Sequence, residues 1–188
     1  MKFSVDNYIN EHFKVFSSMD KKAIQRSLDL VIKTIDKEKK IITCGNGGSA
    51  STASHYITDW NKMYNLATGK KLRGLSLVDN VGLITAYAND IDYDNIFSGQ
   101  IKSIMDKGDL LIVISGSGNS SNIIKAIEAG LSAGGNILGV LGYDGGKAIS
   151  MCHEVFHTPS WDMQICEDIH LSFGHLVMKS ICRDNINN

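Results

Sequence analysis

The stretch Leu110-Leu-Ile-Val-Ile-Ser-Gly-Ser-Gly-Asn-Ser-Ser121 joins a run of apolar residues to a loop rich in glycine and serine. A second stretch, Ile41-Ile-Thr-Cys-Gly-Asn-Gly-Gly-Ser49, has the same order, and a helical pattern follows each loop. Continuous apolar runs of this length are typical of strands buried on both faces of a parallel sheet. These two strand–loop–helix units therefore predict an α/β fold.

The rest of the chain continues this alternation. Short apolar runs at 72–78, 137–141 and 155–156 bring the predicted strands to five. Segments long enough for crossover helices lie at 49–60, 80–105 and 120–130, with a short piece near Lys147 and a last helix over 161–183. We expect a three-layer α/β sandwich around a central five-stranded parallel sheet.

The residues before the first strand have a helical pattern. Apolar residues recur every three or four positions from Asn7 to Lys39, and Ser18-Met-Asp20 predicts a break between two helices. We interpret residues 1–188 as one domain with a helical N-terminal extension over 1–39. The extension could cap the sheet edge or pack against another subunit, and we favour the subunit contact.

Composition narrows the class of protein. The 188 residues include 43% hydrophobic and 21% charged residues, and the net charge of -1 does not favour a basic nucleic-acid-binding module. No apolar run approaches the roughly 20 residues of a membrane span, and the N-terminus has no signal-like stretch. The four cysteines are too scattered for a zinc knuckle or a disulfide scaffold. We expect a cytoplasmic protein with neither nucleic-acid nor membrane partners.

The two glycine-rich loops predict an anion site, because ligands bind at the carboxyl ends of parallel strands. Glycines allow close backbone approach, and the N–H groups at a helix start attract negative charge. Neither loop has the lysine of a nucleoside-triphosphate loop. Residues 45–50 match a loose dinucleotide pattern, but Asp79, the candidate acidic partner, lies about thirty residues on instead of about twenty. A monophosphate fits better, although each loop alone could be only a tight turn.

Histidines and carboxylates on two predicted helices form a second candidate site. His55 and Asp59 are four residues apart, so they share one helix face, and the last helix carries Glu167, His170 and His175. A His/carboxylate pair on each helix could perform acid–base catalysis or bind a divalent metal. The same spacing also occurs by chance on solvated helices.

Taken together, these motifs resemble the phosphoheptose isomerase family of sugar isomerase (SIS) domains. The resemblance runs from about Phe13 to the C-terminus and rests on 44–49, His55, 89–98, 114–120, 142–147 and 169–175. It implies a flavodoxin-like SIS fold and a homotetramer in which the N-terminal helices pack. It also implies conversion of sedoheptulose 7-phosphate to D-glycero-D-manno-heptose 7-phosphate through an enediol(ate), for lipopolysaccharide or capsule heptose.

The resemblance assigns roles position by position. It implies one zinc ion per subunit, held by His55, Asp59, Glu167 and His175, with Asp59 and His175 as the acid/base pair. Ser115, Gly116, Ser117 and Ser120 would form the phosphate cradle. The full set of implied substrate contacts is Asn46, Gly47, Gly48, Ser49, Asp59, Asn89, Asp90, Ser115, Gly116, Ser117, Ser120 and Glu167.

Two positions depart from the family pattern, in which Glu is usual at Asp59 and Gln at Glu167. The shorter Asp withdraws the carboxylate by about 1.5 Å, which can reduce the rate on the order of a hundredfold. The added charge of Glu167 favours a divalent metal. One hypothesis is that the two changes are coupled and move the metal slightly.

Two other functions are compatible with these residues. One is a non-catalytic SIS module that binds a phosphosugar or a protein partner, and the other is an isomerase for another sugar phosphate, because 61–67 lacks arginines that relatives often have there. We predict structural roles for His153, His157 and His170 and packing roles for Trp60 and Trp161, and nothing marks Cys44 as a nucleophile.

Overall fold

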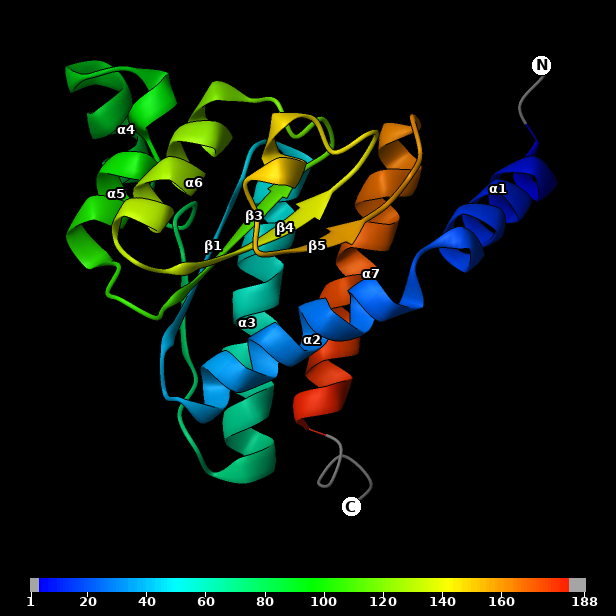
Figure 1. Cartoon of the computed structure of the whole chain (residues 1–188), viewed down its shortest axis with the longest axis horizontal. Coiled ribbons are helices and arrows are strands. Elements are labelled where there is room, and N and C mark those ends of the chain that lie inside the picture. Colours follow the sequence, from blue (N-terminus) through cyan, green and yellow to red (C-terminus); the bar gives the residue numbers. More distant parts are fainter. Residues whose placement is uncertain (1–3, 183–188) are drawn as a thin grey trace.

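The computed structural model describes residues 4–182 and contains a five-stranded parallel sheet. The strands follow the order β2-β1-β3-β4-β5, and their bounds are Lys40–Gly45 (β1), Arg73–Ser76 (β2), Leu110–Ser115 (β3), Asn136–Leu141 (β4) and Glu154–His157 (β5). The predicted sheet is therefore confirmed. The winding direction reverses between β1 and β3, which lie side by side in the sheet (Figure 1). Sheets of this kind bind ligands at the carboxyl ends of the strands where the direction reverses.

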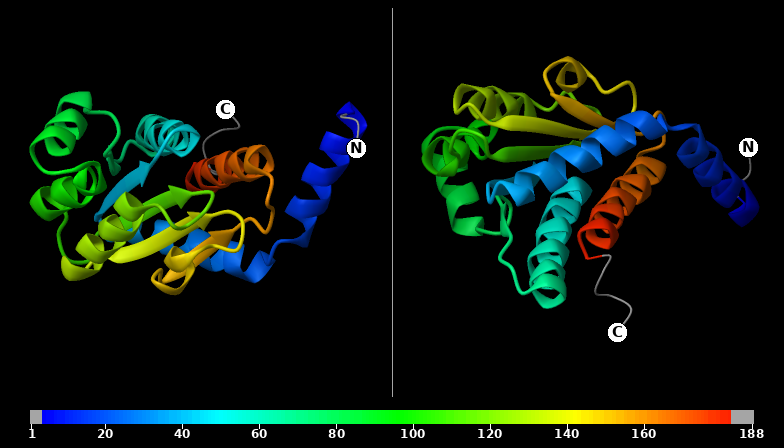
Figure 2. Two further views of the ribbon diagram at one scale, coloured as in Figure 1. Left: turned by 90° about the horizontal axis from the view of Figure 1, so that it is seen from above. Right: turned by 60° about the horizontal axis from the view of Figure 1, so that its bottom comes forward.

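Helices cover both faces of the sheet and complete the three predicted layers (Figures 1 and 2). One face packs against α2 (Lys21–Asp36), α3 (Gly48–Thr68) and α7 (Met163–Ile181). The other face packs against α4 (Val81–Asp90), α5 (Ser98–Ile104) and α6 (Ser121–Ser132). Every residue of β3 is buried, as its continuous apolar run predicts.

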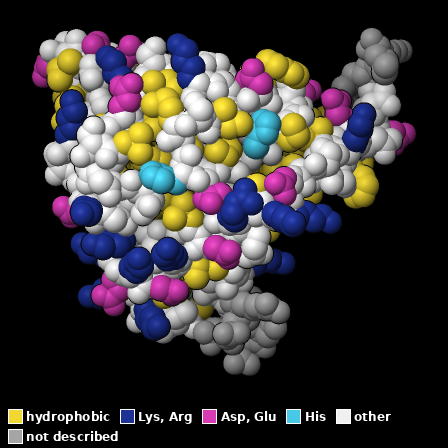
Figure 3. Space-filling model, viewed as in Figure 1, with side chains coloured by type: hydrophobic (Ala, Val, Ile, Leu, Met, Phe, Trp, Pro, Cys, Tyr) yellow, Lys and Arg dark blue, Asp and Glu magenta, His cyan; other side chains and the backbone are white. Residues whose placement is uncertain are grey.

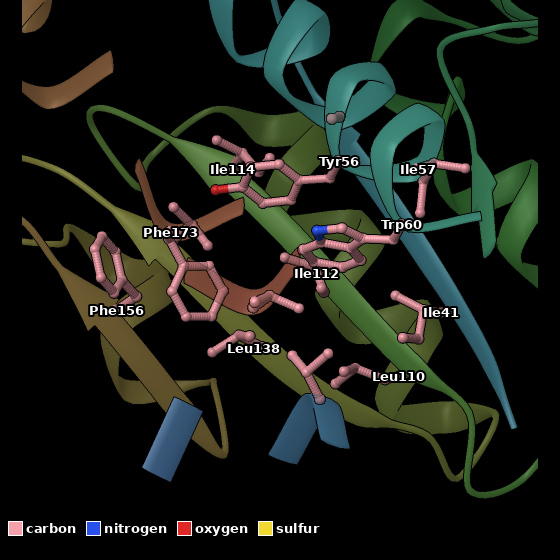
Figure 4. Packing of buried hydrophobic residues seen from close by; sticks show 14 of the residues in the cluster. Ile41, Tyr56, Ile57, Trp60, Leu110, Ile112, Ile114, Leu138, Phe156 and Phe173 are labelled. Carbon is pink, nitrogen blue, oxygen red and sulfur yellow. The ribbon is translucent and has the colours of Figure 1, made fainter. Parts of the chain in front are cut away.

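Aromatic side chains fix α3 against α7. Tyr56 and Trp60 stack with ring centroids 5.0 Å apart above the sheet, beside Phe173 (Figure 4). The Trp60 Nε1–H donates to the Gly174 carbonyl over 2.9 Å, and the Tyr56 hydroxyl donates to the His170 carbonyl. A Cβ at Gly174 would lie 2.4 Å from the Tyr56 ring. These contacts set both the separation and the rotation of the two helices.

Two predicted helices have different bounds in the structure. The segment 80–105 is not one helix, because a 3-10 turn at Tyr93–Asn95 separates α4 from α5. There the Asn95 side chain donates to Asp92 Oδ1 over 2.6 Å, and such local bonds compete with helical ones. The last helix begins at Met163, because the Asp162 carboxylate caps its first turn, and the predicted end at 183 lies outside the described residues.

The N-terminal extension forms two helices, α1 (Val5–Ser18) and α2, and Asp20 caps α2 at the predicted break. In Figures 1 and 2, α1 projects from the rest of the molecule. The hydroxyl of Tyr8 donates to Asp168 of α7, but none of the described residues of α1 is buried. Among the described residues, no helix combines the length and the apolar character that a membrane crossing requires.

Candidate functional site

The loop between β1 and α3 exposes the start of a helix. Gly47 has φ +54°, a left-handed conformation that favours glycine, and it lets the chain turn directly from the strand into α3. Ser49, in the first turn of α3, is buried beneath the loop. The N–H groups at the start of a helix can donate to an anion.

The loop between β3 and α6 is supported from behind by a third loop. The Ser115 hydroxyl accepts from the Gly118 N–H over 3.0 Å, and Gly118 has φ +62°. The Ala148 N–H donates to the Gly118 carbonyl, and the Lys147 N–H donates to Asn119 Oδ1, both over 3.0 Å. These bonds give the Gly142–Lys147 motif a structural role, because they hold the serine-rich loop in shape.

The two loops enclose a small cavity, which we name the serine pocket. Its volume is about 130 Å³ and its lining residues are Asn46, Ser49, Ile114, Ser115, Gly116, Ser117, Ser120, Met163 and Glu167. The Ser120 hydroxyl makes no capping bond to α6. Neither lysine nor arginine is among the described residues that line this pocket. An anion here would be held by hydroxyl and backbone donors.

Three side chains meet on the outer faces of α3 and α7, and we name them the His–Asp group. His55 Nε2 lies 3.2 Å from both His175 Nε2 and Asp59 Oδ2, and His175 Nε2 lies 3.8 Å from Asp59 Oδ2. The side chains are 44%, 48% and 28% exposed for His55, His175 and Asp59, so substrate can reach them.

The His–Asp group has a donor set that fits zinc. All three donor atoms lie within 4.8 Å of one another. Zinc binds imidazole nitrogen and carboxylate oxygen at about 2.0 to 2.2 Å in tetrahedral sites, which places neighbouring ligand atoms about 3.3 Å apart. The observed separations of 3.2, 3.2 and 3.8 Å are close to that spacing. Three protein ligands leave a fourth position open, as in catalytic zinc sites.

Glu167 does not belong to this group of three. Its carboxylate lies against Gly48, where an added Cβ would meet Oε1 at 2.2 Å, and it lines the serine pocket. Glu167 precedes His175 by eight residues, about 12 Å along a helix. The serine pocket and the His–Asp group therefore lie at opposite ends of one seam between α3 and α7.

Asn89 and Asp90 lie at the end of α4 and are exposed. The Asn89 side chain donates to Asp90 Oδ1 over 2.9 Å, and neither residue lines the serine pocket. The nearby Tyr93 hydroxyl reaches the first loop, where it donates to Asn46 Oδ1 over 3.2 Å.

The residues predicted to be structural are mostly packed or bonded to backbone. His170 is 1% exposed, and burial lowers its pKa to about 4 because the charged ring loses hydration. The Ile137 N–H donates to His153 Nδ1, and His157 Nε2 contacts the Tyr143 carbonyl. Burial raises the pKa of the Cys44 thiol far above its ordinary value, which makes a nucleophilic thiolate unfavourable.

The two tryptophans differ in exposure. Trp60 is fully buried in the core, whereas Trp161 is 73% exposed and stacks on Tyr143 with ring centroids 5.0 Å apart. The predicted packing role is therefore confirmed for Trp60, whereas Trp161 is a surface residue that contacts Tyr143.

Comparison with known proteins identifies relatives over nearly the whole chain. A family model for the SIS domain matches residues 6–142. A phosphoheptose isomerase of Aliarcobacter butzleri is 34% identical over 168 residues, which cover 89% of this chain and 88% of the relative. One from Helicobacter pylori strain P12 is 34% identical over 186 residues, covering 95% and 96%. The chain belongs to the phosphoheptose isomerase family.

A solved structure of this family has the same architecture. Phosphoheptose isomerase GmhA from Neisseria gonorrhoeae matches with a TM-score of 0.86 and 27% identity, covering 94% of this chain and 96% of that one. The predicted family resemblance and the flavodoxin-like SIS fold are thus confirmed. Sequence reasoning had given no role to Met163, whose sulfur packs where a Cβ at Gly116 would lie. Met163 directly follows Asp162, the N-cap of α7. This position at the start of a helix is the sequence signal that could have predicted its contact with the loop.

Proposed function

We propose that this chain is an aldose–ketose isomerase that converts sedoheptulose 7-phosphate to D-glycero-D-manno-heptose 7-phosphate. The observation that carries the proposal is the seam between α3 and α7, with the serine pocket at one end and the His–Asp group at the other. The two ends are about 12 Å apart along α7, roughly the length of a seven-carbon sugar phosphate. Family membership supports the same reaction.

Asp59 is the proposed carbon base. The reaction removes a proton from C1 of the ketose, forms an enediol(ate), and returns a proton to C2. A carboxylate is a suitable base for both transfers when it lies over the reacting carbons. The Asp59 carboxylate lies beside both histidines and is the least exposed member of its group, which limits its solvation.

His175 is the proposed acid/base for the oxygens. The proton on O1 must leave while the oxygen at C2 gains one, and an imidazole can do both near neutral pH. His55 lies 3.2 Å from His175 and orients its ring. When bound, a zinc ion would polarise the carbonyl and stabilise negative charge on the sugar oxygens. His55, Asp59 and His175 are the residues that would hold it.

The serine pocket is the proposed phosphate cradle, formed by Ser115, Gly116, Ser117 and Ser120. Binding energy from this remote group orients the reacting end of the sugar, so phosphate should be required for turnover. Asn46 and Glu167 also line this pocket, so they would contact the phosphate end of the substrate and the adjoining sugar carbons. The further substrate contacts in this proposal are Asn46, Gly47, Gly48, Ser49, Asn89 and Asp90.

Zinc content can be tested independently of turnover. We expect about one zinc per subunit in the wild-type protein, and strong loss in His55→Ala and His175→Ala, because each removes a nitrogen ligand. His153→Ala, a histidine bonded to backbone outside the group, is the matched control and should keep its zinc. Equal zinc in all four proteins would contradict the assignment of His55 and His175 as ligands.

The exposed α1 supports a homotetramer. Apolar side chains along this helix are largely solvent-accessible, namely Val5, Ile9, Phe13 and Phe16 at 66%, 58%, 72% and 43%. Figure 3 shows hydrophobic side chains at the surface of this projecting arm. Burial of such a face is favourable, and a second copy of the chain offers the same face. Light scattering of wild type against Phe13→Asp would test the assembly.

All four cysteines are free, as in a reducing compartment, which supports a cytoplasmic enzyme in heptose precursor synthesis.

The decisive experiment is proton NMR of sedoheptulose 7-phosphate in D₂O with zinc-loaded protein. We expect the aldose to appear with solvent deuterium at C2. Unphosphorylated sedoheptulose should turn over far more slowly. Binding without conversion or exchange would instead favour a phosphosugar-binding module, and conversion of only another ketose phosphate would overturn the substrate assignment.

A further inference from the structure

Two amide side chains, the buried Asn122 and the partly buried Asn46, join the loops of the serine pocket. Asn46 Nδ2 donates to Asn122 Oδ1 over 2.9 Å, and Asn122 Nδ2 donates to Asn46 Oδ1 over 2.8 Å. Asn46 belongs to the loop after β1, and Asn122 is the second residue of α6, directly behind the serine-rich loop. The residues are 76 positions apart in the chain, so this reciprocal pair connects the two loops side by side.

The pair is partly buried and determines how the Asn46 amide is oriented. Asn122 is 2% exposed. Asn46 Oδ1 accepts a second bond from the Tyr93 hydroxyl over 3.2 Å, so both acceptor positions of this oxygen are occupied. One Asn46 Nδ2 hydrogen is used by Asn122, and Asn46 lines the serine pocket. The remaining Nδ2 hydrogen is the polar position of this side chain that is left for a ligand.

We propose that Asn122 is a positioning residue that orients the Asn46 amide as a hydrogen-bond donor to the phosphate end of the substrate. This inference rests on the proposed sugar-phosphate function. A phosphate group accepts hydrogen bonds, so an Asn46 side chain turned the other way would present its oxygen to the ligand and repel it. Asn122 disfavours that flip, because it would place the Asn46 amide nitrogen against the Asn122 amide nitrogen and the Asn46 oxygen against the Asn122 oxygen. The flip would also remove the oxygen that accepts from the Tyr93 hydroxyl. The same bonds hold the loops at a fixed separation.

The test is Asn122→Asp, which keeps the side-chain shape. The new carboxylate can accept from Asn46 Nδ2 but cannot donate to Asn46 Oδ1. We expect the dissociation constant for inorganic phosphate, measured by calorimetry, to rise about tenfold, and the KM for the sugar phosphate to rise in parallel with a smaller change in kcat. Asn46→Ala should weaken phosphate binding by a similar factor, and adding Asn122→Asp to it should have little further effect, since Asn122 acts through Asn46.

Asn61 provides a matched control. Its side chain makes an equivalent reciprocal pair with the Gly74 backbone, at 3.0 and 3.1 Å, which ties α3 to β2. Asn61→Asp should lower the melting temperature and leave phosphate affinity unchanged. A merely structural role for Asn122 would give the same result as this control and would overturn the proposal.

Tyr93→Phe keeps the proposal falsifiable if Asn122→Asp does not fold. Tyr93 is 57% exposed, so loss of its hydroxyl should not prevent folding, and we expect a two- to threefold weaker phosphate affinity. Unchanged affinity in Tyr93→Phe, or additive effects of the changes at positions 46 and 122, would overturn the inference. Loss of phosphate affinity in a protein that isomerises no sugar phosphate would refute the proposed reaction and leave the role of Asn122 intact.

Discussion

The two ends of the α3–α7 seam are constructed differently. The serine pocket is formed by three interlocked loops at the carboxyl ends of the strands, and Ser49, Ser115 and Asn122 are buried in or behind it. The His–Asp group consists of side chains on the outer faces of two long helices, and its histidines are nearly half exposed. Ligand binding in the serine pocket therefore depends mainly on the backbone conformation of its loops. The chemistry of the His–Asp group depends mainly on which side chains occupy its three positions.

This difference predicts separable effects. A change at the His–Asp group should alter chemistry and leave anion binding intact, while a change in loop shape should alter anion binding first. Inorganic phosphate affinity and kcat are the two measurements that distinguish the ends.

The largest effect is expected from Asp59→Asn. Loss of the proposed base should lower kcat by about 10³-fold, within the range of general base catalysis, with inorganic phosphate affinity within about twofold of wild type. Asp29→Asn, an exposed carboxylate on α2 that bonds Gln25, is the control and should retain full kcat. A large loss of phosphate affinity in Asp59→Asn would show that the ends are not independent.

The stability of the protein should depend on pH through His170, which lies on the buried side of α7. The unfolded His170 ring titrates near 6.5, while burial holds its folded pKa at about 4, so between these values the unfolded chain binds more protons. The free energy of unfolding should therefore fall as pH decreases through this window, by about 2–3 kcal/mol between pH 7 and pH 4.5 from this group.

Urea unfolding of His170→Leu would test this assignment. The variant should lack that part of the pH dependence, whereas Phe173→Leu, a buried change on the same helix without a titratable group, should retain it. Identical pH dependence in wild type and His170→Leu would contradict it.

Loop shape is tested by two glycines with similar positive φ angles, Gly118 at +62° and Gly69 at +69°. Gly118→Ala places a methyl 2.0 Å from the Gly145 carbonyl, so the third loop must shift, and phosphate affinity should fall about tenfold. Gly69→Ala has φ +69° but meets no atom within 4 Å. It should cost about 1 kcal/mol of stability at the end of α3, with phosphate affinity unchanged. Equal phosphate affinities in the two variants would argue against a preformed cradle.

The smallest effect is expected from Glu167→Gln. The described lining of the serine pocket includes neither lysine nor arginine, so removing a negative charge there should tighten inorganic phosphate binding about threefold to tenfold. Glu128→Gln, an exposed carboxylate on α6, should have no effect. Combining Glu167→Gln with Asp59→Glu should give multiplicative changes in kcat/KM, because the carboxylates lie at opposite ends of the seam. A strongly non-multiplicative result would support the coupled change of a shared metal site.

Much of this arrangement is local in the sequence and could be predicted. The strands follow from apolar runs, the two loops from glycine beside serine, and the shared face of His55 and Asp59 from their spacing. The partner of that pair on α7 could not be derived in this way. It depends on the rotation of α7, which the Tyr56 and Trp60 hydrogen bonds set through tertiary packing. The link between Asn46 and Asn122 likewise has no periodic signal, because it exists only once β1 and β3 pair.

The bonds from Tyr56 and Trp60 end on main-chain carbonyls of α7, not on its side chains. These two hydrogen bonds therefore do not depend on the side chains that α7 carries, apart from Gly174, where the Tyr56 ring leaves no room for a side chain. Residues on the outward face of α7 can therefore be substituted without removing the hydrogen bonds that join α7 to α3. The same pair of helices could therefore carry different functional side chains. Position 167 is one where a substitution should change the free energy of unfolding little.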